Sequence, residues 1–522
     1  MQDQPPIFLV WPVGDRSESP GSAESTLAVL GDDYEVVWER PRTVGRAYVD
    51  TPDLRLHRKG MALVHDRSGR ASARDVLRFT SADTSSSCQV EPLDWPAYPT
   101  VLPEPLRAPV GRAASIRALL PACAARVRTR EARVLDDETK TVVRLWWEEP
   151  TLVEPARTVL DPWVYVQPVR GYGADAERVV ELLTGAGMAR SPDREPELVF
   201  QQGAVLDGRT RPPRPVDATQ PADVAVAAAL LNFLDAVEAN VDGAVDDIDT
   251  EFLHDLRVGV RRTRSLVRLA GDVLPARLAG RFAPKFKWLG DVTTPNRDLD
   301  VYLLGYDQLT ASLTVADPAE LEPFREHLEK VRTQRRRGLV RGLRSARLSN
   351  LLQQWRDALT PIADGEAGGA VAVTAGQLAS ERIAKAHRRV VRRAGKITVD
   401  SPAADVHDLR KRCKELRYLL EVFTPVCERK PVRRAVRDLR RMQDILGAFQ
   451  DGHVQRQSLR TYAEEMLAAG TATAACLLAM GELIATSDAK LRLAQEHLVG
   501  QVAQYLDDRS TQHVLDLTGG AS

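Results

Sequence analysis

The tetrapeptide His254-Asp255-Leu256-Arg257 recurs as His407-Asp408-Leu409-Arg410, and each copy opens a stretch with helical periodicity. At about 100° per residue, positions 0, 3, 7, 10 and 14 of such a helix fall on one narrow stripe. The opposite stripe is apolar in both copies, so each helix is predicted to bury one face and to expose a basic one. In the first copy the stripe holds His254, Arg257, Arg261, Arg264 and Arg268, and in the second it holds His407, Arg410, Lys414, Arg417 and Glu421.

A row of charge on a helix is most often a solvated face, but these two stripes argue against that interpretation. Solvated faces usually mix signs, because like charges at helical spacing repel by a few tenths of a kcal/mol. The repulsion is unrelieved along the first stripe, where arginine predominates, and the planar guanidinium group suits phosphate oxygens. We therefore predict that a polyanionic ligand lies across both stripes. His254 and His407, at the same repeat position, are predicted to contact it.

The bulk composition is that of a soluble globular protein. A chain of 522 residues is too long for one core, and 43% hydrophobic with 28% charged residues is ordinary. The net charge is zero, so only local patches can predict anion binding. The five cysteines show no CxxC spacing, which predicts a reducing compartment without disulfides. Because we identify neither a signal peptide nor an apolar run of about 18 residues, we expect a cytoplasmic protein without membrane contact.

Residues 1–206 are predicted to form an α+β domain with antiparallel strands. Apolar or alternating stretches bounded by Pro and Gly predict strands at residues 7–11, 34–38, 142–146 and 163–166. Helices are predicted at residues 111–120 and 175–186. Residues 207–222, rich in Pro and Arg, are predicted to be a linker.

From residue 223 to 517 the pattern is almost wholly helical. Pro275 and Pro425 follow the two histidine-bearing segments, as proline does beyond a helix C-terminus. The next helix in each half is predicted to end at a Leu-Gly pair, Leu289-Gly290 or Leu446-Gly447, before a short connector and a further helix. The repeat predicts two helical bundles, residues 223–365 and 375–510, related by a pseudo-twofold axis.

These residues resemble the CHAD family, the conserved-histidine α-helical domains. The resemblance rests on the two tetrapeptides, on the basic residues that follow them, and on the phrases Leu289-Gly290, 297–301, Leu416-Arg417-Tyr418 and 439–447. Four extra residues in the first connector, and Gln450-Asp451 where Asn-Asp is usual, depart from the family pattern. The resemblance implies an all-helical domain that binds inorganic polyphosphate. The candidate contacts are His254, Arg257, Arg261, Arg264, Arg268, His407, Arg410, Lys414, Arg417 and Arg440.

Residues 48–56 and 59–63 resemble the strand–turn–strand signature of the CYTH family, the triphosphate tunnel enzymes. That resemblance implies an antiparallel barrel that holds triphosphate on inward Arg and Lys and a divalent metal on inward Glu. The chain departs from it, because the opening strand has no carboxylate and residues 165–169 read Tyr-Val-Gln-Pro-Val. We therefore predict a degenerate CYTH-like domain without metal-binding carboxylates. The remaining candidates for phosphate-facing cations are Arg78, Arg130, Arg133 and Arg144. The last three are equally consistent with ordinary exposed strand residues.

The sequence thus predicts an inorganic polyphosphate-binding protein with no catalytic residue, no metal site and no cofactor. No P-loop, Gly-x-Ser-x-Gly, His-Glu-x-x-His or paired Cys/His spacing is present. One alternative is a metal-dependent triphosphatase of the CYTH type, against which the missing carboxylates argue. The other is a nucleic-acid-binding module, which would usually place aromatic residues among its cations. The expected location is the cytoplasm, including polyphosphate granules, and protein partners are not predicted.

Overall fold

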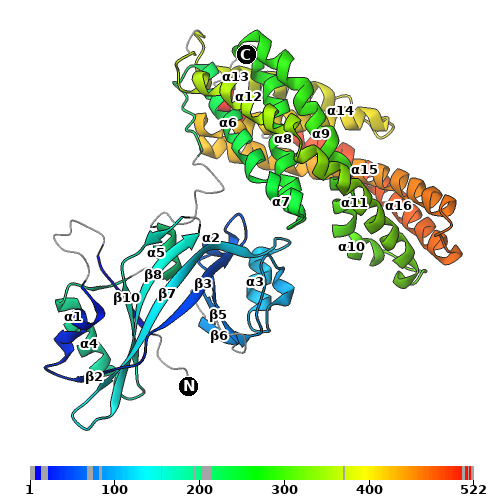
Figure 1. Ribbon diagram of the computed structural model, residues 1–522. Coiled ribbons are helices and arrows are strands. Elements are labelled where there is room, and N and C mark those ends of the chain that lie inside the picture. The colour runs from blue at the N-terminus through cyan, green and yellow to red at the C-terminus, as the bar shows by residue number, and fades with distance from the viewer. Residues whose placement is uncertain are drawn as a thin grey trace. The chain divides into compact units, whose positions relative to one another are not determined.

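The computed structural model describes residues 6–12, 21–67, 74–81, 85–154, 156–191, 195–201, 213–367, 371–507, 512–514 and 516–518. The chain divides into two compact units, residues 1–211 and 212–522 (Figure 1). Of the predicted linker, residues 207–212 lie outside the described residues. Residues 213–221 contain no helix, and the first helix of the second unit begins at Ala222.

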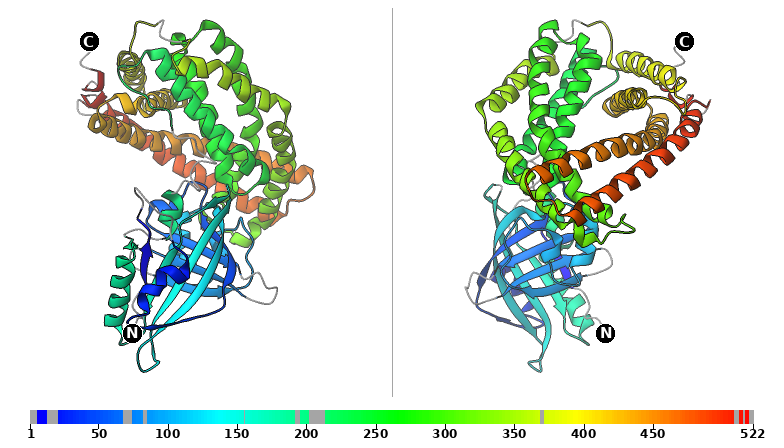
Figure 2. Two further views of the ribbon diagram at one scale, coloured as in Figure 1. Left: turned by 60° about the vertical axis from the view of Figure 1, so that its left-hand side comes forward. Right: turned by 90° about the vertical axis from the view of Figure 1, so that its right-hand side faces the viewer.

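The N-terminal unit is built on one antiparallel sheet with the strand order β11-β1-β10-β8-β7-β3-β4-β5-β6. The sheet curls around its own inner face (Figure 2). Among the described residues the end strands β11 and β6 do not pair with each other, so the sheet is an open half-barrel. The strands are β1 (Ile7–Val10), β2 (Glu35–Trp38), β3 (Arg42–Asp50), β4 (Ala62–Arg67), β5 (Asp75–Thr80), β6 (Ser85–Val90), β7 (Leu120–Leu135), β8 (Thr141–Glu154), β9 (Thr158–Val159), β10 (Trp163–Pro168) and β11 (Ala189–Arg190).

Short helices cover parts of this sheet. They are α1 (Ala23–Leu27), α2 (Arg55–Arg58), α3 (Arg107–Ala114), α4 (Gly173–Gly185) and α5 (Glu195–Gln201). Helices α1 and α4 pack on β1, β8 and β10, and α2 and α3 pack on β3, β4 and β5. Val199 and Phe200 of α5 join an inner cluster with Tyr48 and Trp163. The curled sheet therefore has helices on its outside and α5 at its inner cluster.

The four predicted strands and the helix at residues 175–186 are confirmed as β1, β2, β8, β10 and α4. The helix predicted at residues 111–120 is wrong at both ends. Helix α3 begins at Arg107 and stops at Ala114, because Ser115 has a φ of 58° and leaves the right-handed helical region. Leu120 instead begins the long strand β7.

The second unit is all-helical, and its two halves pack their helices in the same order. In the first half α8 packs against α6 and α9, and α11 packs against α9; in the second, α14 packs against α13 and α15, and α16 packs against α15. Two reciprocal backbone hydrogen bonds join the halves, from Ala222 N to Val373 O and from Ala375 N to Gln220 O. Ala222 and Ala375 are separated by the same number of residues as His254 and His407, and so are Gln220 and Val373. Such equal spacing is expected of two halves related by a pseudo-twofold axis. The helices are α6 (Ala222–Ala239), α7 (Val241–Asp246), α8 (Thr250–Ala270), α9 (Ala276–Leu304), α10 (Tyr306–Thr310), α11 (Glu322–Leu343), α12 (Ala346–Ala363), α13 (Ala375–Ala394), α14 (Ala403–Val422), α15 (Arg429–Ala468) and α16 (Ala474–Tyr505).

The predicted breaks after the two Leu-Gly pairs are wrong. Helix α9 continues through Gly290 and Pro295, and α15 continues through Gly447. A Cβ at Gly290 would lie 3.1 Å from Nη1 of Arg264, so this glycine lies against the arginine side chain and does not terminate the helix. The hydroxyl groups of Thr293 and Thr294 donate to the carbonyl oxygens of Leu289 and Gly290 at 2.9 Å and 2.7 Å.

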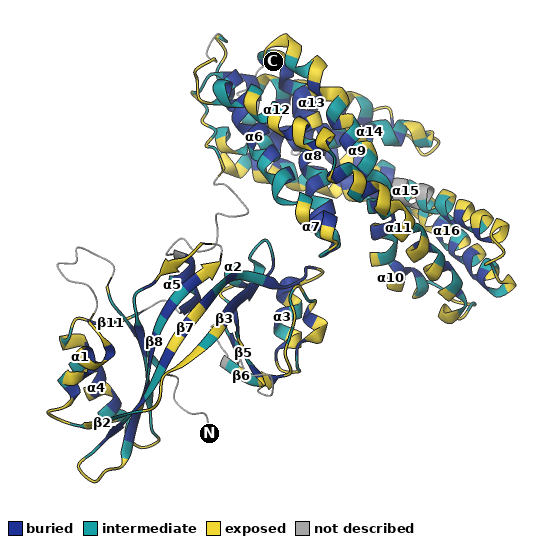
Figure 3. Cartoon of the chain, viewed as in Figure 1, coloured by how far each residue is buried: buried dark blue, intermediate teal, exposed yellow. Residues whose placement is uncertain are grey.

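The predicted apolar stripes of α8 and α14 are confirmed as buried. Leu256, Val260, Thr263, Val267 and Ala270 are at most 8% exposed. Their counterparts on α14, namely Leu409, Cys413, Leu416, Leu420 and Phe423, are at most 1% exposed. Figure 3 shows buried and exposed residues alternating along these helices. The core of the second unit therefore fixes which face of each helix can meet a ligand.

Helix α6 contradicts the expectation that no apolar run reaches the length of a membrane span. Residues Ala222–Asp246 have the length and hydropathy of a spanning helix, and half of the apolar window is buried within the protein. Val226, Leu230, Leu231 and Leu234 of α6 are at most 1% exposed and belong to the main core of the second unit. The apolar character of α6 is accounted for by that burial.

Candidate functional site

Two adjacent pockets follow the exposed face of α8. One, of about 440 Å³, lies between α8 and α9, and the other, of about 400 Å³, lies between α8 and α14. Arg261 and Arg264 line both pockets, so we treat the two as one feature and call it the α8–α14 groove. Its charged lining residues are His254, Arg257, Arg261, Arg264, Arg268, Arg297, Asp298, Arg410, Lys411, Lys414 and Glu415.

The groove brings together seven of the ten predicted contacts, five from α8 and two from α14. Arg261, Arg264 and Arg268 are exposed, whereas His254 and Arg257 are half-buried. Sequence reasoning did not select Arg297 and Lys411. Arg297 belongs to a phrase already matched to the family, so that signal was available. Lys411 follows Arg410 directly and lies about 100° away on an isolated helix, so a single-stripe criterion excludes it.

Three predicted contacts do not line the groove, namely His407, Arg417 and Arg440. Arg417 lies 3.4 Å from the carboxylate of Glu421 and covers one side of the Tyr418 ring. His407 is half-buried on α14, and Arg440 is exposed on α15. The pseudo-twofold repeat of sequence therefore does not produce two equal halves of the groove.

Arg257 has a structural role in the groove, because it connects α8 to α9 by hydrogen bonds. Its Nη1 donates to the carbonyl oxygen of Gly290 at 3.3 Å and to the hydroxyl oxygens of Thr293 and Thr294 at 3.0 Å and 2.8 Å. Burial lowers the pKa of this guanidinium, and Arg261 and Arg297 lower it further against the opposing effect of Asp298. Arg257 thus fastens α8 to α9 and adds positive charge to the wall of the groove.

Burial and charged neighbours both act on His254. Burial is the main cause that lowers the pKa of the imidazole; Arg297 and Arg261 also lower it, and Glu251 and Asp255 oppose them. The imidazole is therefore neutral at pH 7 in the free protein. A bound anion would offset the neighbouring guanidinium groups and favour the protonated ring.

Acidic side chains neutralise part of the charge of the groove, and one of them, Asp298, lines the pocket beside α9. Glu415 of α14, which is buried, lies 2.7 Å from Nη2 of Arg268. Arg262, outside the groove lining, pairs with Glu421 at 2.9 Å and joins α8 to α14. No ion pair with a described residue is formed by Arg261 or Arg264, the two arginines shared by both pockets. The centre of the groove is therefore its most cationic part.

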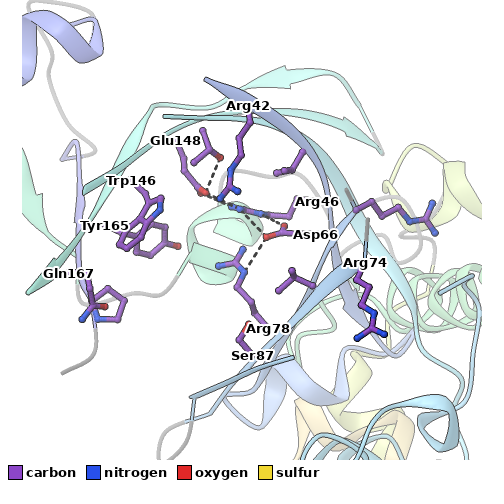
Figure 4. Close-up of a pocket in the computed structure, with 15 residues that line it drawn as sticks. Arg42, Arg46, Asp66, Arg74, Arg78, Ser87, Trp146, Glu148, Tyr165 and Gln167 are labelled. Carbon is purple, nitrogen blue, oxygen red and sulfur yellow. Dashed lines mark hydrogen bonds and ion pairs between the residues drawn. The ribbon is translucent and has the colours of Figure 1, made fainter. Parts of the chain in front are cut away.

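The inner face of the N-terminal sheet forms a separate pocket of about 710 Å³ with charged residues on its wall (Figure 4). Arg46 of β3, only 4% exposed, is its central cation. Its Nη1 lies 2.6 Å from Glu148 and 2.7 Å from Glu195, and its Nε donates to Asp66 at 2.7 Å. One guanidinium group therefore holds three carboxylates from β8, α5 and β4.

Glu195 is the most enclosed of these carboxylates. It accepts hydrogen bonds from the hydroxyl groups of Tyr48 and Tyr165 at 2.5 Å and 2.6 Å, and Nη1 of Arg78 donates to it at 3.3 Å. Burial alone would raise the pKa of Glu195, but Arg46, Arg78 and the two hydroxyl groups outweigh it and lower that pKa. Glu195 is thus an ionised internal partner of both arginines.

The interior contains carboxylates on strands that the prediction did not consider. The opening strand and the strand at residues 165–169 carry none, but Asp66 and Glu148 line the pocket from β4 and β8. Within the described part of the chain, no group of three or more His, Cys, Asp or Glu side chains is arranged to hold a metal ion. The carboxylates are held by Arg46 instead.

Of the four arginines considered for this domain, only Arg78 lines the pocket. Arg130 pairs with Glu24 and stacks on Trp38 at 4.3 Å from the ring centre. Arg133 and Arg144 lie 3.5 Å and 3.2 Å from Glu39 and Glu131. These three arginines form ion pairs and do not line the pocket. Arg42, Arg67 and Arg74, which sequence reasoning did not select, also line it.

Comparisons with known proteins find matches to the helical region. Residues 228–460 match the family model of the CHAD domain. The CHAD domain from the plant Ricinus communis is 25% identical over 56% of this chain and 96% of its own, with a TM-score of 0.48. PptA from Streptomyces chartreusis is 16% identical over 55% of this chain and 100% of its own, with a TM-score of 0.40.

The N-terminal region has structural matches of its own. HpAC1 from Hippeastrum, described as an adenylyl cyclase with a dominant triphosphatase activity, is 13% identical over 39% of this chain and 97% of its own, with a TM-score of 0.25. No match was found among curated proteins.

Proposed function

We propose that this chain, whose residues 228–460 form a CHAD domain, binds inorganic polyphosphate in the α8–α14 groove. The observation that carries the proposal is the position of Arg261 and Arg264, which line both pockets of the groove. Arg257, Arg261, Arg264 and Arg268 extend over about 17 Å at the rise of an α-helix. A linear row of fixed cations suits a linear polyanion better than it suits a single phosphate group.

A nucleic-acid ligand is less well supported by the groove. Sequence-tolerant binding of single strands relies on aromatic side chains on which bases stack. Tyr418 is the aromatic residue in the described lining of the groove, and it is only 5% exposed. Arg261 and Arg417 both lie against its ring, at 5.4 Å and 5.6 Å from the centre. Its faces are therefore not available to a base.

The proposal is tested by the salt dependence of binding. Long-chain polyphosphate should bind the full chain with an affinity that falls linearly on a log–log plot against salt, because each contact releases condensed counterions. Isothermal titration at four or more salt concentrations measures that slope. An affinity that does not change with salt would contradict binding by a row of cations.

The dependence on pH should identify His254 as part of the site. Because burial and two arginines lower its pKa in the free protein, binding of an anion should be coupled to proton uptake. Affinity should then be highest below the lowered pKa of the free protein. It should fall as pH rises from that pKa to the raised pKa of the complex, by at most about tenfold per pH unit for one proton, and level off above it. Titrations from about pH 5.5 to pH 8 at fixed ionic strength measure this effect.

Three histidine variants provide the controls for that experiment. His254→Gln should flatten the pH dependence, and the double variant His254→Gln, His407→Gln should be no flatter. His407→Gln alone should keep the behaviour of the wild type, because His407 does not line the groove. An equal pH dependence in the wild type and in His254→Gln would show that His254 does not take up a proton when the ligand binds.

The N-terminal domain is expected not to hydrolyse tripolyphosphate or nucleoside triphosphates with Mg²⁺ or Mn²⁺. Mg²⁺ requires carboxylate oxygens, and those of Asp66, Glu148 and Glu195 are engaged by Arg46. Phosphate release from the full chain measures this. Metal-dependent turnover abolished by Glu148→Gln, but retained by Glu149→Gln next to it, would overturn the expectation.

A further inference from the structure

A third cationic pocket, of about 450 Å³, lies between α15, α16 and the C-terminal segment. It shares no lining residue with the α8–α14 groove. Arg434, Arg437 and Arg441 of α15 line one wall, at the spacing of one helical stripe. The opposite wall includes Gln501, Gln504, Tyr505 and His513.

Two acidic residues, Asp438 and Asp507, line this pocket beside its three arginines. Asp438 lies 2.9 Å from Nδ1 of His513 and 3.9 Å from Nε of Arg437. Arg434 and Arg441 are exposed and make no ion pair with a described residue. Two guanidinium groups are therefore available, with the donor geometry that matches phosphate oxygens.

Tyr505 provides an independent indication of a ligand. The residue is 4% exposed, and its hydroxyl group has no hydrogen-bond partner in the described structure. A buried hydroxyl group without a partner costs free energy, and a ligand oxygen would remove that cost. Burial raises the pKa of this hydroxyl well above its ordinary value, so it remains protonated and can donate.

This pocket has no counterpart in the first half of the repeat. When Leu446-Gly447 is aligned with Leu289-Gly290, Arg434 corresponds to Arg277, but Arg437 and Arg441 correspond to Gly280 and Pro284, so only one of the three arginines is repeated. The α16 wall also lies beyond residue 460, where the family match ends. The pocket therefore belongs to this chain's second half and is not a copy of the groove.

We propose that the pocket between α15 and α16 is a second anion site, which binds a phosphate group through Arg434, Arg441 and the hydroxyl of Tyr505. The phosphate group belongs either to a free short ligand such as pyrophosphate or to the end of a polyphosphate chain. The site does not depend on the proposed groove, because the two share no residue.

The experiment uses the full chain carrying Arg261→Ala and Arg264→Ala, so that the groove does not contribute. Pyrophosphate and long-chain polyphosphate are titrated separately at fixed ionic strength. Adding Arg434→Ala and Arg441→Ala should weaken binding of one of the two ligands roughly tenfold or more. Tyr505→Phe, which leaves the charge unchanged, should weaken the same ligand severalfold. The matched control is Arg433→Ala with Arg460→Ala, two exposed arginines of α15 outside the pocket lining.

The outcomes separate the sources of the phosphate and the two proposals. Loss of pyrophosphate binding identifies a free short ligand, and loss confined to long-chain polyphosphate identifies the polyphosphate chain. Unchanged binding of both ligands, or an equal loss in the Arg433, Arg460 control, overturns the second site. If Arg261→Ala and Arg264→Ala do not change polyphosphate binding, the proposal that the groove binds polyphosphate is contradicted. The test of the pocket between α15 and α16 remains valid in that case.

Discussion

Replacement of Arg261 and Arg264 together by alanine is expected to weaken the binding of long-chain polyphosphate roughly hundredfold, taking about 1.5 kcal/mol for each lost charged hydrogen bond. These two arginines line both pockets of the groove and make no ion pair with a described residue. The slope of log affinity against log salt should fall by about two units. Isothermal titration at several salt concentrations measures both quantities.

The control for this variant removes the same charge from another helix. Arg337 and Arg341 of α11 are exposed and do not line the groove. Their double replacement by alanine should change the affinity only slightly, through the long-range field. A loss as large as that of the Arg261, Arg264 variant would show that net charge, and not the groove, governs binding. Arg257 is a poorer probe, because its removal also deprives Gly290, Thr293 and Thr294 of a donor.

Replacement of Arg46 by methionine should destabilise the N-terminal domain by about 3–5 kcal/mol, the cost of leaving buried charges uncompensated. Methionine cannot pair with Asp66, Glu148 or Glu195, which Arg46 now contacts at 2.6–2.7 Å. Urea unfolding of the full chain, followed by the fluorescence of Trp147 and Trp163 against the helical signal of the second unit, measures the change. A loss below about 1 kcal/mol would show that water or rearrangement compensates the carboxylates.

A matched control and the pH dependence sharpen that test. Arg133→Met removes an ion pair whose arginine side chain is 40% exposed and should cost less than about 1 kcal/mol. The lowered pKa of Glu195 stabilises the wild type above the pKa of the unfolded chain. This contribution should disappear as pH falls through the folded-state pKa, and the Arg46→Met variant should lack it.

The helical half of the molecule could be predicted in outline because its signal is local and repeated. The stripes of α8 and α14 follow from a period of 3.6 residues, and the burial of Leu256 and Leu409 confirms them. The ends of α9 and α15 could not be predicted in this way. Gly290 is typical of a helix end, but here it serves the approach of Arg264. That use of glycine depends on a neighbouring helix and is invisible in the local sequence.

The interior of the N-terminal sheet was the least predictable part of the candidate sites. Arg46 and Asp66 face each other across β3 and β4, and this pairing depends on strand register. Glu148 comes from β8, and Glu195 comes from α5, far along the chain. The opening strand and residues 165–169 carry no carboxylate, and the carboxylates of the interior lie on other elements. Charged residues that share one face of several paired strands can be identified only when the strand order and register are known.

The claim that the groove recognises polyphosphate, and not any nucleic-acid polyanion, is tested most directly by competition. Long-chain polyphosphate is titrated into the full chain at fixed salt, with and without single-stranded RNA at an equal concentration of phosphate groups. We expect saturable binding of polyphosphate that RNA displaces only weakly, because the Tyr418 ring is covered by Arg261 and Arg417. The absence of saturable binding, or equal displacement by RNA, would contradict this account.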